Sequence, residues 1–182
     1  MNISREQKLQ AVLECGRKLN EIRDTEVLLK QILSEARRVV NADAGSIYVV
    51  EDKQEPRSFV SSSLVSSATV SAPSIYAMPV SERKNYFKNK MLRIKYAQND
   101  TKNQDDYKNF SFNITERSIA GYSVLSGEIL NIDDVYKISS EKEYSFDAYT
   151  DEQMRYKTRS MLTIPLITSN RQSLGVLQII NA

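Results

Sequence analysis

Apolar residues recur at helical spacing through the N-terminal part of the chain. Ser4 and Gln7 form a capping-box pattern, which typically begins a helix. That helix would present one apolar face, made of Leu9, Val12, Leu13, Gly16 and Leu19. Asp24 or Thr25 can cap a second helix, whose wide apolar stripe lies within residues 27–40. The pattern therefore predicts two consecutive amphipathic helices.

After Asn41 the apolar pattern changes to the period of two that is typical of strands. The predicted strands cover residues 46–50, 92–96, 110–114, 128–132, 160–168 and 174–180. A short helix over Ile119–Ser126 lies between them; Ser118 can cap its start and Gly127 can end it in the left-handed conformation. Pro165 cannot donate to a strand ladder, so we expect it at a bulge or on an unpaired side. Because strands and helices mix without regular alternation, we expect the α+β class with an antiparallel sheet.

Residues 53–90 do not fit this pattern. They carry seven serines between positions 61 and 74, with Pro73 and Pro79 nearby, and then a basic stretch. Scattered apolar residues suggest one or two additional strands, at Phe59, Val60, Leu64, Val65 and Val70. Long segments of this composition are either functional lids or flexible inserts. The composition leaves both interpretations open.

Length and charge narrow the class of protein. The chain has 182 residues, of which 41% are hydrophobic and 26% charged, and this favours one globular domain over residues 1–182. A formal net charge of +2 provides no basic surface for nucleic acid. No apolar run reaches the length of a membrane helix, and the N-terminal residues lack the apolar core of a secretory signal. We therefore expect a cytoplasmic protein that binds neither nucleic acid nor membrane.

The chain contains no histidine and one cysteine. Without histidine it cannot form a Ser-His-Asp or Cys-His nucleophile, a histidine-ligated haem or an imidazole zinc site. Cys15 cannot form an internal disulfide, which fits a reducing compartment, and we expect it to be a small buried hydrophobe. The acidic pairs at 105–106, 133–134 and 151–152 are more typical of solvated loops and helix starts than of metal sites. These features favour a binding or regulatory module over an enzyme, with no metal and no resident cofactor.

Several segments resemble the GAF domain, a small-molecule-sensing module of phosphodiesterases, cyclases and bacterial signalling proteins. The matching segments are residues 36–48, 96–100, 118–122, 127–136, 156–166 and 174–181. The resemblance covers residues 26–52 and 91–182, and it is closest to bacterial GAF domains attached to HD-GYP phosphodiesterases or nucleotide cyclases. It implies a sheet of roughly six antiparallel strands, with two N-terminal helices on one face and short helices over a ligand pocket on the other.

Two departures from the family pattern concern the ligand. In such relatives an asparagine and a basic residue follow Phe146, and Thr-Gly precedes the later tyrosine; this chain has Asp147, Ala148, Met154 and Arg155 there. Cyclic-nucleotide-binding relatives carry an Asn-Lys, Phe, Asp-Glu signature from the end of the last strand, where this chain has Asn181-Ala182. We therefore expect the closing C-terminal helix of the family to be absent and the ligand-facing helix to be altered.

The expected pocket lies under the Ser118 helix and the segment 146–159. Ser118 and the N–H groups of Ile119 and Ala120 can receive a phosphate or carboxylate, although a plain N-cap explains the same residues. Ser46, Gln98 and Asn131 lie on strands that we expect to face the same space, where they bind a ligand or bond to backbone.

The segment 146–159 supplies the remaining candidates, which are rings for stacking on a ligand and polar groups for its edge. The rings are Phe146, Tyr149 and Tyr156, and the polar groups are Asp147, Asp151 and Thr158. Rings at this spacing also occur in protein cores. Asp147 opposes an anionic ligand unless Arg155 or Arg159 pairs with it, which weakens the case for a cyclic nucleotide.

The sequence supports three functional hypotheses. The first is a non-catalytic regulatory domain that binds a small molecule, such as a cyclic nucleotide, and controls an attached signalling enzyme. The second is a dimerisation and signal-relay module without ligand, in which the Leu9, Val12 and Leu19 face forms a homodimer. The third, an enzyme, has the least support because no nucleophile and base are recognisable.

Overall fold

The computed structural model describes residues 5–6, 10, 13–14, 16–17, 24–53, 74–99 and 110–182. The described residues before position 24 are helical and exposed, as predicted for the first helix. Cys15 and the expected dimer residues Leu9, Val12 and Leu19 lie outside the described residues, as do the strands suggested between residues 59 and 70.

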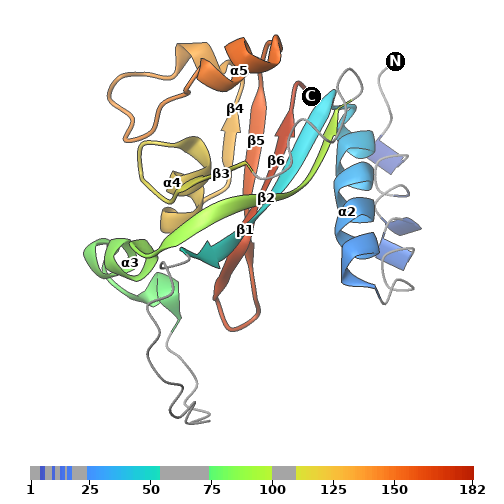
Figure 1. The fold of residues 1–182 in the computed structure, drawn as a ribbon. Helices are drawn as coiled ribbons and strands as arrows, with labels where there is room; N and C mark the ends of the chain where they lie inside the picture. The colour runs from blue at the N-terminus through green and yellow to red at the C-terminus, as the bar shows by residue number, and fades with distance from the viewer. Residues whose placement is uncertain are drawn as a thin grey trace, which may run out of the picture.

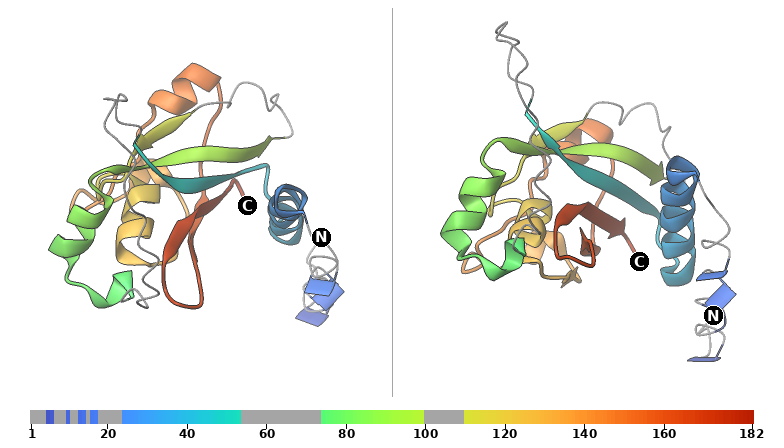
Figure 2. Two further views of the ribbon diagram at one scale, coloured as in Figure 1. Left: turned by 60° about the horizontal axis from the view of Figure 1, so that its bottom comes forward. Right: turned by 90° about the horizontal axis from the view of Figure 1, so that it is seen from below.

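Helix α2 (Thr25–Val40) is the predicted second helix. The Asp24 carboxylate caps it by accepting hydrogen bonds from the N–H groups of Glu26 (2.8 Å) and Val27 (3.0 Å). Asn41 ends it in the left-handed conformation, with φ of 55°. Leu33 and Ala36 pack against the sheet. The described turns of the first helix lie on the far side of α2 from the sheet (Figures 1 and 2), so of the two N-terminal helices α2 is the one that covers it.

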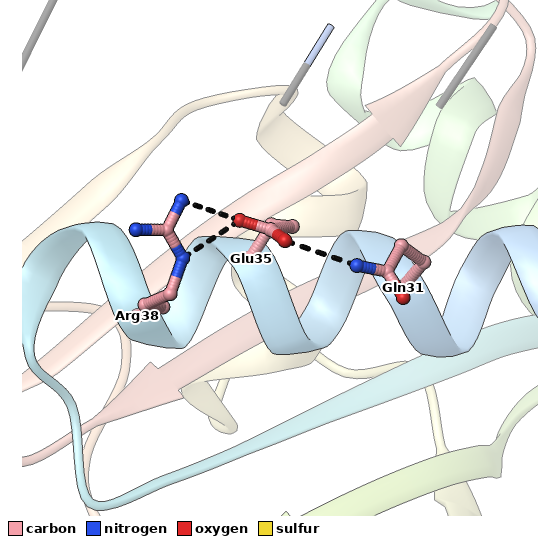
Figure 3. A network of polar contacts seen from close by, with 3 residues as sticks. All are labelled: Gln31, Glu35 and Arg38. Atoms are coloured by element: carbon pink, nitrogen blue, oxygen red, sulfur yellow. Dashed lines mark hydrogen bonds and ion pairs between the residues drawn. The ribbon is translucent and has the colours of Figure 1, made fainter. Parts of the chain in front are cut away.

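The outer side of α2 carries a buried carboxylate (Figure 3). Glu35 is only 6% exposed, although helical spacing places it opposite Leu33. Its two oxygens accept hydrogen bonds from the Arg38 guanidinium (2.6 and 2.8 Å) and the Gln31 amide (3.0 Å). A buried charge needs such partners, so this network accounts for a glutamate in the packed part of the helix.

The sheet has six strands in the order β3-β2-β1-β6-β5-β4, and each neighbouring pair is antiparallel. Their bounds are β1 Ala44–Asp52, β2 Lys90–Asn99, β3 Ser111–Asn113, β4 Leu130–Ile132, β5 Met161–Ile167 and β6 Ser173–Ile180. The expected α+β fold with six antiparallel strands is therefore confirmed. Because β1 is central and covered on both faces, its first five residues are all buried instead of alternating with exposed ones.

Short helices cover the face of the sheet opposite α2 (Figure 1). They are the 3₁₀ turns η1 (Ile75–Ala77) and η3 (Val135–Lys137) and the helices α3 (Val80–Phe87), α4 (Ile119–Ser126) and α5 (Tyr149–Met154). Helix α4 has the predicted bounds, with Ser118 as its N-cap and Gly127 at φ of 78° after its end. The core on this face includes Phe87, Val124 and Val176.

The described part of the 53–90 segment contributes to this core. Residues 74–90 hold η1 and α3, which the serine-rich composition did not indicate. Phe87 is 1% exposed, whereas the other α3 residues are exposed or half-buried, so the helix shows little apolar periodicity.

Pro165 lies on β5, where β4 no longer pairs with it. The pairs between β4 and β5 end at Thr163, and the β5–β6 register shifts between Leu166 and Ile167. A proline is tolerated there because no ladder bond to β4 is lost. No helix within the described residues has the length and apolar character needed to cross a bilayer.

Candidate functional site

A pocket of about 90 Å³ opens where the start of β1 and the end of β2 meet α5. Its lining is mostly apolar, with a few polar side chains. The described lining residues are Ala44, Gly45, Ser46, Tyr48, Ile94, Ala97, Gln98, Asn99, Phe110, Asp151, Tyr156, Thr158 and Ile180. In Figure 1 this is the upper end of the sheet, where α5 lies above the strands.

Asp151 is the charged residue of this lining, and it is 7% exposed. Its carboxylate accepts hydrogen bonds from the Tyr136 hydroxyl (2.8 Å), the Thr158 backbone N–H (2.7 Å) and the Thr158 hydroxyl (2.7 Å). The chain reverses after α5 because Arg155 adopts the left-handed conformation, with φ of 47°. That reversal brings Thr158 beside Asp151, so a local turn builds this part of the site.

The bond to Asp151 also changes the chemistry of Tyr136. As hydrogen-bond acceptor, the carboxylate raises the pKa of Tyr136 to about 12, and loss of water around the phenol acts in the same direction. The Lys157 ammonium lies 3.3 Å from the centroid of the same ring, a cation–π contact. Tyr136 therefore remains a neutral hydrogen-bond donor at physiological pH.

Tyr156 connects the pocket to the ends of two other elements. Its hydroxyl donates to the Asp43 carboxylate, just before β1, and accepts from the Asn181 amide, just after β6 (2.9 Å). The Asp43 carbonyl in turn accepts a hydrogen bond from the Arg37 guanidinium on α2 (2.6 Å). A continuous set of hydrogen bonds therefore runs from the pocket wall to the helix on the opposite face.

Ser46 places a buried hydroxyl in the pocket wall. The residue is 5% exposed, and its Oγ has no hydrogen-bond partner in the described part of the chain. It stands in a row with Gln178 and Thr163 on adjacent strands, where the Gln178 amide donates to the Thr163 hydroxyl at 3.3 Å. An unpartnered buried hydroxyl is costly, so this oxygen is a position where a bound molecule would gain a hydrogen bond.

Gln98 and Asn131, which we expected to face the same space as Ser46, lie at different places: Gln98 is at the border of the pocket and Asn131 is outside it. Gln98 borders the pocket, but its amide donates to the Lys30 carbonyl (3.3 Å) and accepts from Arg37 on α2. A register shift between Ile47 and Tyr48 changes the alternation along β2, which strand periodicity alone does not reveal. Asn131 pairs with Leu162 and is exposed on the α2 side of the sheet, beyond the area that α2 covers.

The N-terminus of α4, where we expected a ligand to bind, is covered by the protein's own backbone and side chains. The Ser118 hydroxyl accepts from the Gly121 N–H (3.1 Å), while Ile119 and Ala120 are buried in the core. A Cβ on Gly121 would lie 2.2 Å from the Thr115 carbonyl oxygen, so that backbone already covers the helix end. None of the described α4 residues lines the pocket. Ser118 therefore fits a plain N-cap, and the pocket lies under α5 only.

The other predicted residues of the 146–159 segment lie outside the pocket. The Phe146 ring packs edge-on against Tyr136, with centroids 5.1 Å apart. Asp147 is exposed and caps the following turn by accepting from the Tyr149 N–H (3.0 Å), and Tyr149 is 63% exposed. From the predicted set the structure therefore brings together Ser46, Asp151, Tyr156 and Thr158, with Gln98 at the border.

Sequence reasoning missed Asp43, Tyr136 and Asn181. Asp43 and its partner Tyr156 are separated by 113 positions, so no local spacing connects them. Asn181 adopts φ of 56°, a conformation that asparagine tolerates, but this angle is visible only in the structure. The described residues contain no cluster of acidic or cysteine side chains that could hold a metal ion.

Comparisons with known proteins agree with this architecture. The family model of the GAF domain matches residues 24–182. The dual 3',5'-cyclic-AMP and -GMP phosphodiesterase 11A of Takifugu rubripes is 26% identical over 173 residues, which cover 94% of this chain and 16% of that protein. The chain therefore spans a small part of that relative's length.

Two solved structures show the same fold at low sequence identity. The GAF domain from a phosphoenolpyruvate-protein phosphotransferase of Coxiella burnetii superposes with a TM-score of 0.62 at 13% identity, covering 98% of this chain and 80% of that one. Free methionine-R-sulfoxide reductase from Neisseria meningitidis, in complex with its substrate, gives a TM-score of 0.58 at 12% identity, covering 100% and 78%. At such identities the likeness concerns the fold.

Proposed function

The chain belongs to the GAF domain family, and from this premise we propose that it is a non-catalytic sensory domain whose pocket binds a small molecule. The observation that carries the proposal is the pocket under α5, which combines the buried Asp151 and Thr158 with a Ser46 hydroxyl that has no hydrogen-bond partner among the described residues. Pockets with an apolar wall and a few convergent polar groups are typical of small-molecule sites. The fold alone would not suffice, because one fold hosts many functions.

Occupancy of the pocket is proposed to regulate an attached signalling enzyme in the cytoplasm. The matched phosphodiesterase of Takifugu rubripes is much longer than this chain, which is consistent with a regulatory part joined to an output domain. We propose a cyclic-nucleotide or cyclic di-GMP phosphodiesterase or cyclase as that output.

The hydrogen bonds of Tyr156 supply a physical route for such regulation. A ligand that displaces the Tyr156 ring would disturb its bond to Asp43, and Asp43 is held by Arg37 of α2. Movement at the pocket can thereby change the position of α2, which lies between the sheet and the first helix.

Thermal melting of the purified chain with candidate ligands tests the proposal. The panel contains cyclic AMP, cyclic GMP, cyclic di-GMP, amino acids, small carboxylates and small amines. A ligand at about 100 times its Kd should add about 2.7 kcal/mol to the free energy of unfolding, or roughly 5 to 10 °C in Tm. Ser46→Ala should reduce the shift, whereas Ser139→Ala, an exposed serine outside the pocket, should not.

The melting experiment and an assay for turnover can each contradict the proposed function. If no compound shifts the Tm, ligand sensing is contradicted. If the isolated chain turns over any cyclic nucleotide, the non-catalytic assignment is contradicted.

A homodimer through the first helix is a second, compatible proposal. Leu13 is 67% exposed, and all described residues of that helix are exposed, so it offers a free surface. Charge substitutions at Leu9, Val12 and Leu19 should convert the proposed dimer into a monomer in light scattering. An unchanged mass would refute this contact.

A further inference from the structure

We propose that the pocket selects a small ligand that donates hydrogen bonds and is neutral or positively charged, and that it rejects anions, including the phosphate of a cyclic nucleotide. This inference rests on the proposed function, since it specifies the ligand class of the same pocket. Three properties of the lining lead to it: its charge, its free hydrogen-bonding positions and its size.

The charge of the lining is negative. Asp151 is the charged member among the described lining residues, and no described lysine or arginine lines the pocket or forms an ion pair with it. Its partners, Tyr136 and Thr158, are neutral donors that hold the carboxylate without cancelling its charge. Because a partly buried site screens charge less than water does, an anion would be repelled there and a cation attracted.

The hydrogen-bonding positions favour a donor. A carboxylate offers about four acceptor positions, of which the partners of Asp151 among the described residues occupy three. The remaining position can accept from a ligand N–H or O–H. The Ser46 hydroxyl, on the neighbouring strand wall, can either donate or accept. A ligand that carries one donor group toward Asp151 therefore satisfies groups that an anion would leave unpaired.

The size and the apolar wall limit the rest of the ligand. The volume of about 90 Å³ is below the roughly 300 to 1,000 Å³ of sites for drug-sized molecules. Tyr48, Ile94, Phe110 and Ile180 form an apolar wall around it. These properties fit a molecule of a few non-hydrogen atoms with an aliphatic body and a polar head.

Three compounds that share one carbon skeleton test the inference: isobutylamine, isobutyramide and isobutyrate. Each is titrated into the full chain at millimolar concentration, with cyclic AMP as a fourth probe, and binding is followed by backbone amide chemical shifts. We expect the amine and the amide to shift signals around Ser46, Asp151 and Thr158 and to bind about tenfold or more tightly than isobutyrate. Cyclic AMP should leave these signals unchanged.

Variants test whether the side chains of Asp151 and Ser46 cause the preference for the amine and the amide over isobutyrate. Asp151→Asn should abolish the advantage of the amine over isobutyrate, and Ser46→Ala should weaken both the amine and the amide. Asp147→Asn is the matched control, because Asp147 lies in the same segment but is exposed outside the pocket. If Asp151→Asn does not fold, two measurements still test the ligand class. They are the ranking of the probes on the unmodified chain and the weaker binding of the amine and the amide to Ser46→Ala.

The possible failures are distinguishable. If isobutyrate or cyclic AMP binds more tightly than the amine with shifts at the same residues, the inferred ligand class is wrong and the sensory function stands. If no probe of any charge shifts the pocket signals, both the ligand class and ligand sensing are contradicted.

Discussion

Two helical glycines differ in what surrounds them, and this difference predicts opposite effects of the same substitution. A Cβ on Gly121 would lie 2.2 and 2.7 Å from the Thr115 backbone, whereas a Cβ on Gly16 would have no atom of the described residues within 4 Å. Gly121→Ala should therefore lower the free energy of unfolding by about 3 kcal/mol, because backbone must move. Gly16→Ala should leave it unchanged or raise it by up to about 1 kcal/mol. Urea denaturation measures both, and equal effects would contradict the close packing at Thr115.

Thr158 anchors the buried carboxylate of the pocket through its hydroxyl. Thr158→Val keeps the shape of the side chain but leaves one Asp151 oxygen without a donor. The loss of a buried hydrogen bond to a charged group should cost about 2 kcal/mol, or roughly 4 to 8 °C in Tm. Thr115→Val, at an exposed threonine, is the control. A Tm within one degree or so of the unmodified chain would mean that the Thr158–Asp151 bond contributes little.

The Tyr136 phenol should ionise at a higher pH than the other tyrosines of the chain. Since the pKa of Tyr136 in the folded chain is raised to about 12, folding favours the neutral phenol. Its contribution to stability is fully present below about pH 10, the ordinary tyrosine pKa, and is lost as the pH rises towards 12. An absorbance titration at alkaline pH should show one tyrosine ionising last, and Tyr136→Phe should remove that step. Retention of the step in Tyr136→Phe would show that another tyrosine is responsible.

At the level of elements, α3 holds the end of α4. The Arg83 guanidinium donates to the carbonyls of Leu125 (2.7 Å) and Ser126 (3.3 Å), which are left without intrahelical partners at a helix end. Arg83→Ala should lower the free energy of unfolding by about 2 kcal/mol and speed hydrogen exchange in the last turn of α4. Lys88→Ala, at an exposed position just after α3, is the matched control. Equal exchange rates in the two variants would contradict this capping role.

For the whole molecule, the hydrogen bonds of Tyr156 and Asp43 connect the pocket with α2, and we expect ligand binding to change the dynamics of α2 through them. Tyr156→Phe removes the hydroxyl that joins the pocket wall to Asp43 and Asn181 but keeps the ring. We expect the variant to bind the ligand found in the melting panel with its affinity changed less than about fivefold, because it keeps the ring that lines the pocket. Ligand-dependent changes in hydrogen exchange along α2 should be lost in this variant. If these changes persist in the variant, the coupling between the pocket and α2 follows another route.

Local signals in the sequence determined the helices and most of the strands. Asp24, Ser118 and Gly127 act within one turn of their own position, so their roles as caps can be inferred without knowledge of the fold. Runs of apolar and β-branched residues identified β1, β5 and β6, and alternation identified β2, because each of these strands packs at least one apolar face. Helix α3 escaped prediction, since Phe87 alone among its residues is fully buried.

The tertiary structure alone decided which polar residues meet. Asp43 and Tyr156 come together across 113 positions, and Tyr136 reaches Asp151 from a different turn, so no spacing in the chain links them. The register shift between β1 and β2, where β2 has one extra residue, turned Gln98 towards α2, and the approach of Thr115 closed the start of α4. Secondary structure depends on neighbours a few residues apart, whereas a binding site depends on strand register and on close contact between distant segments, which only the packed chain defines.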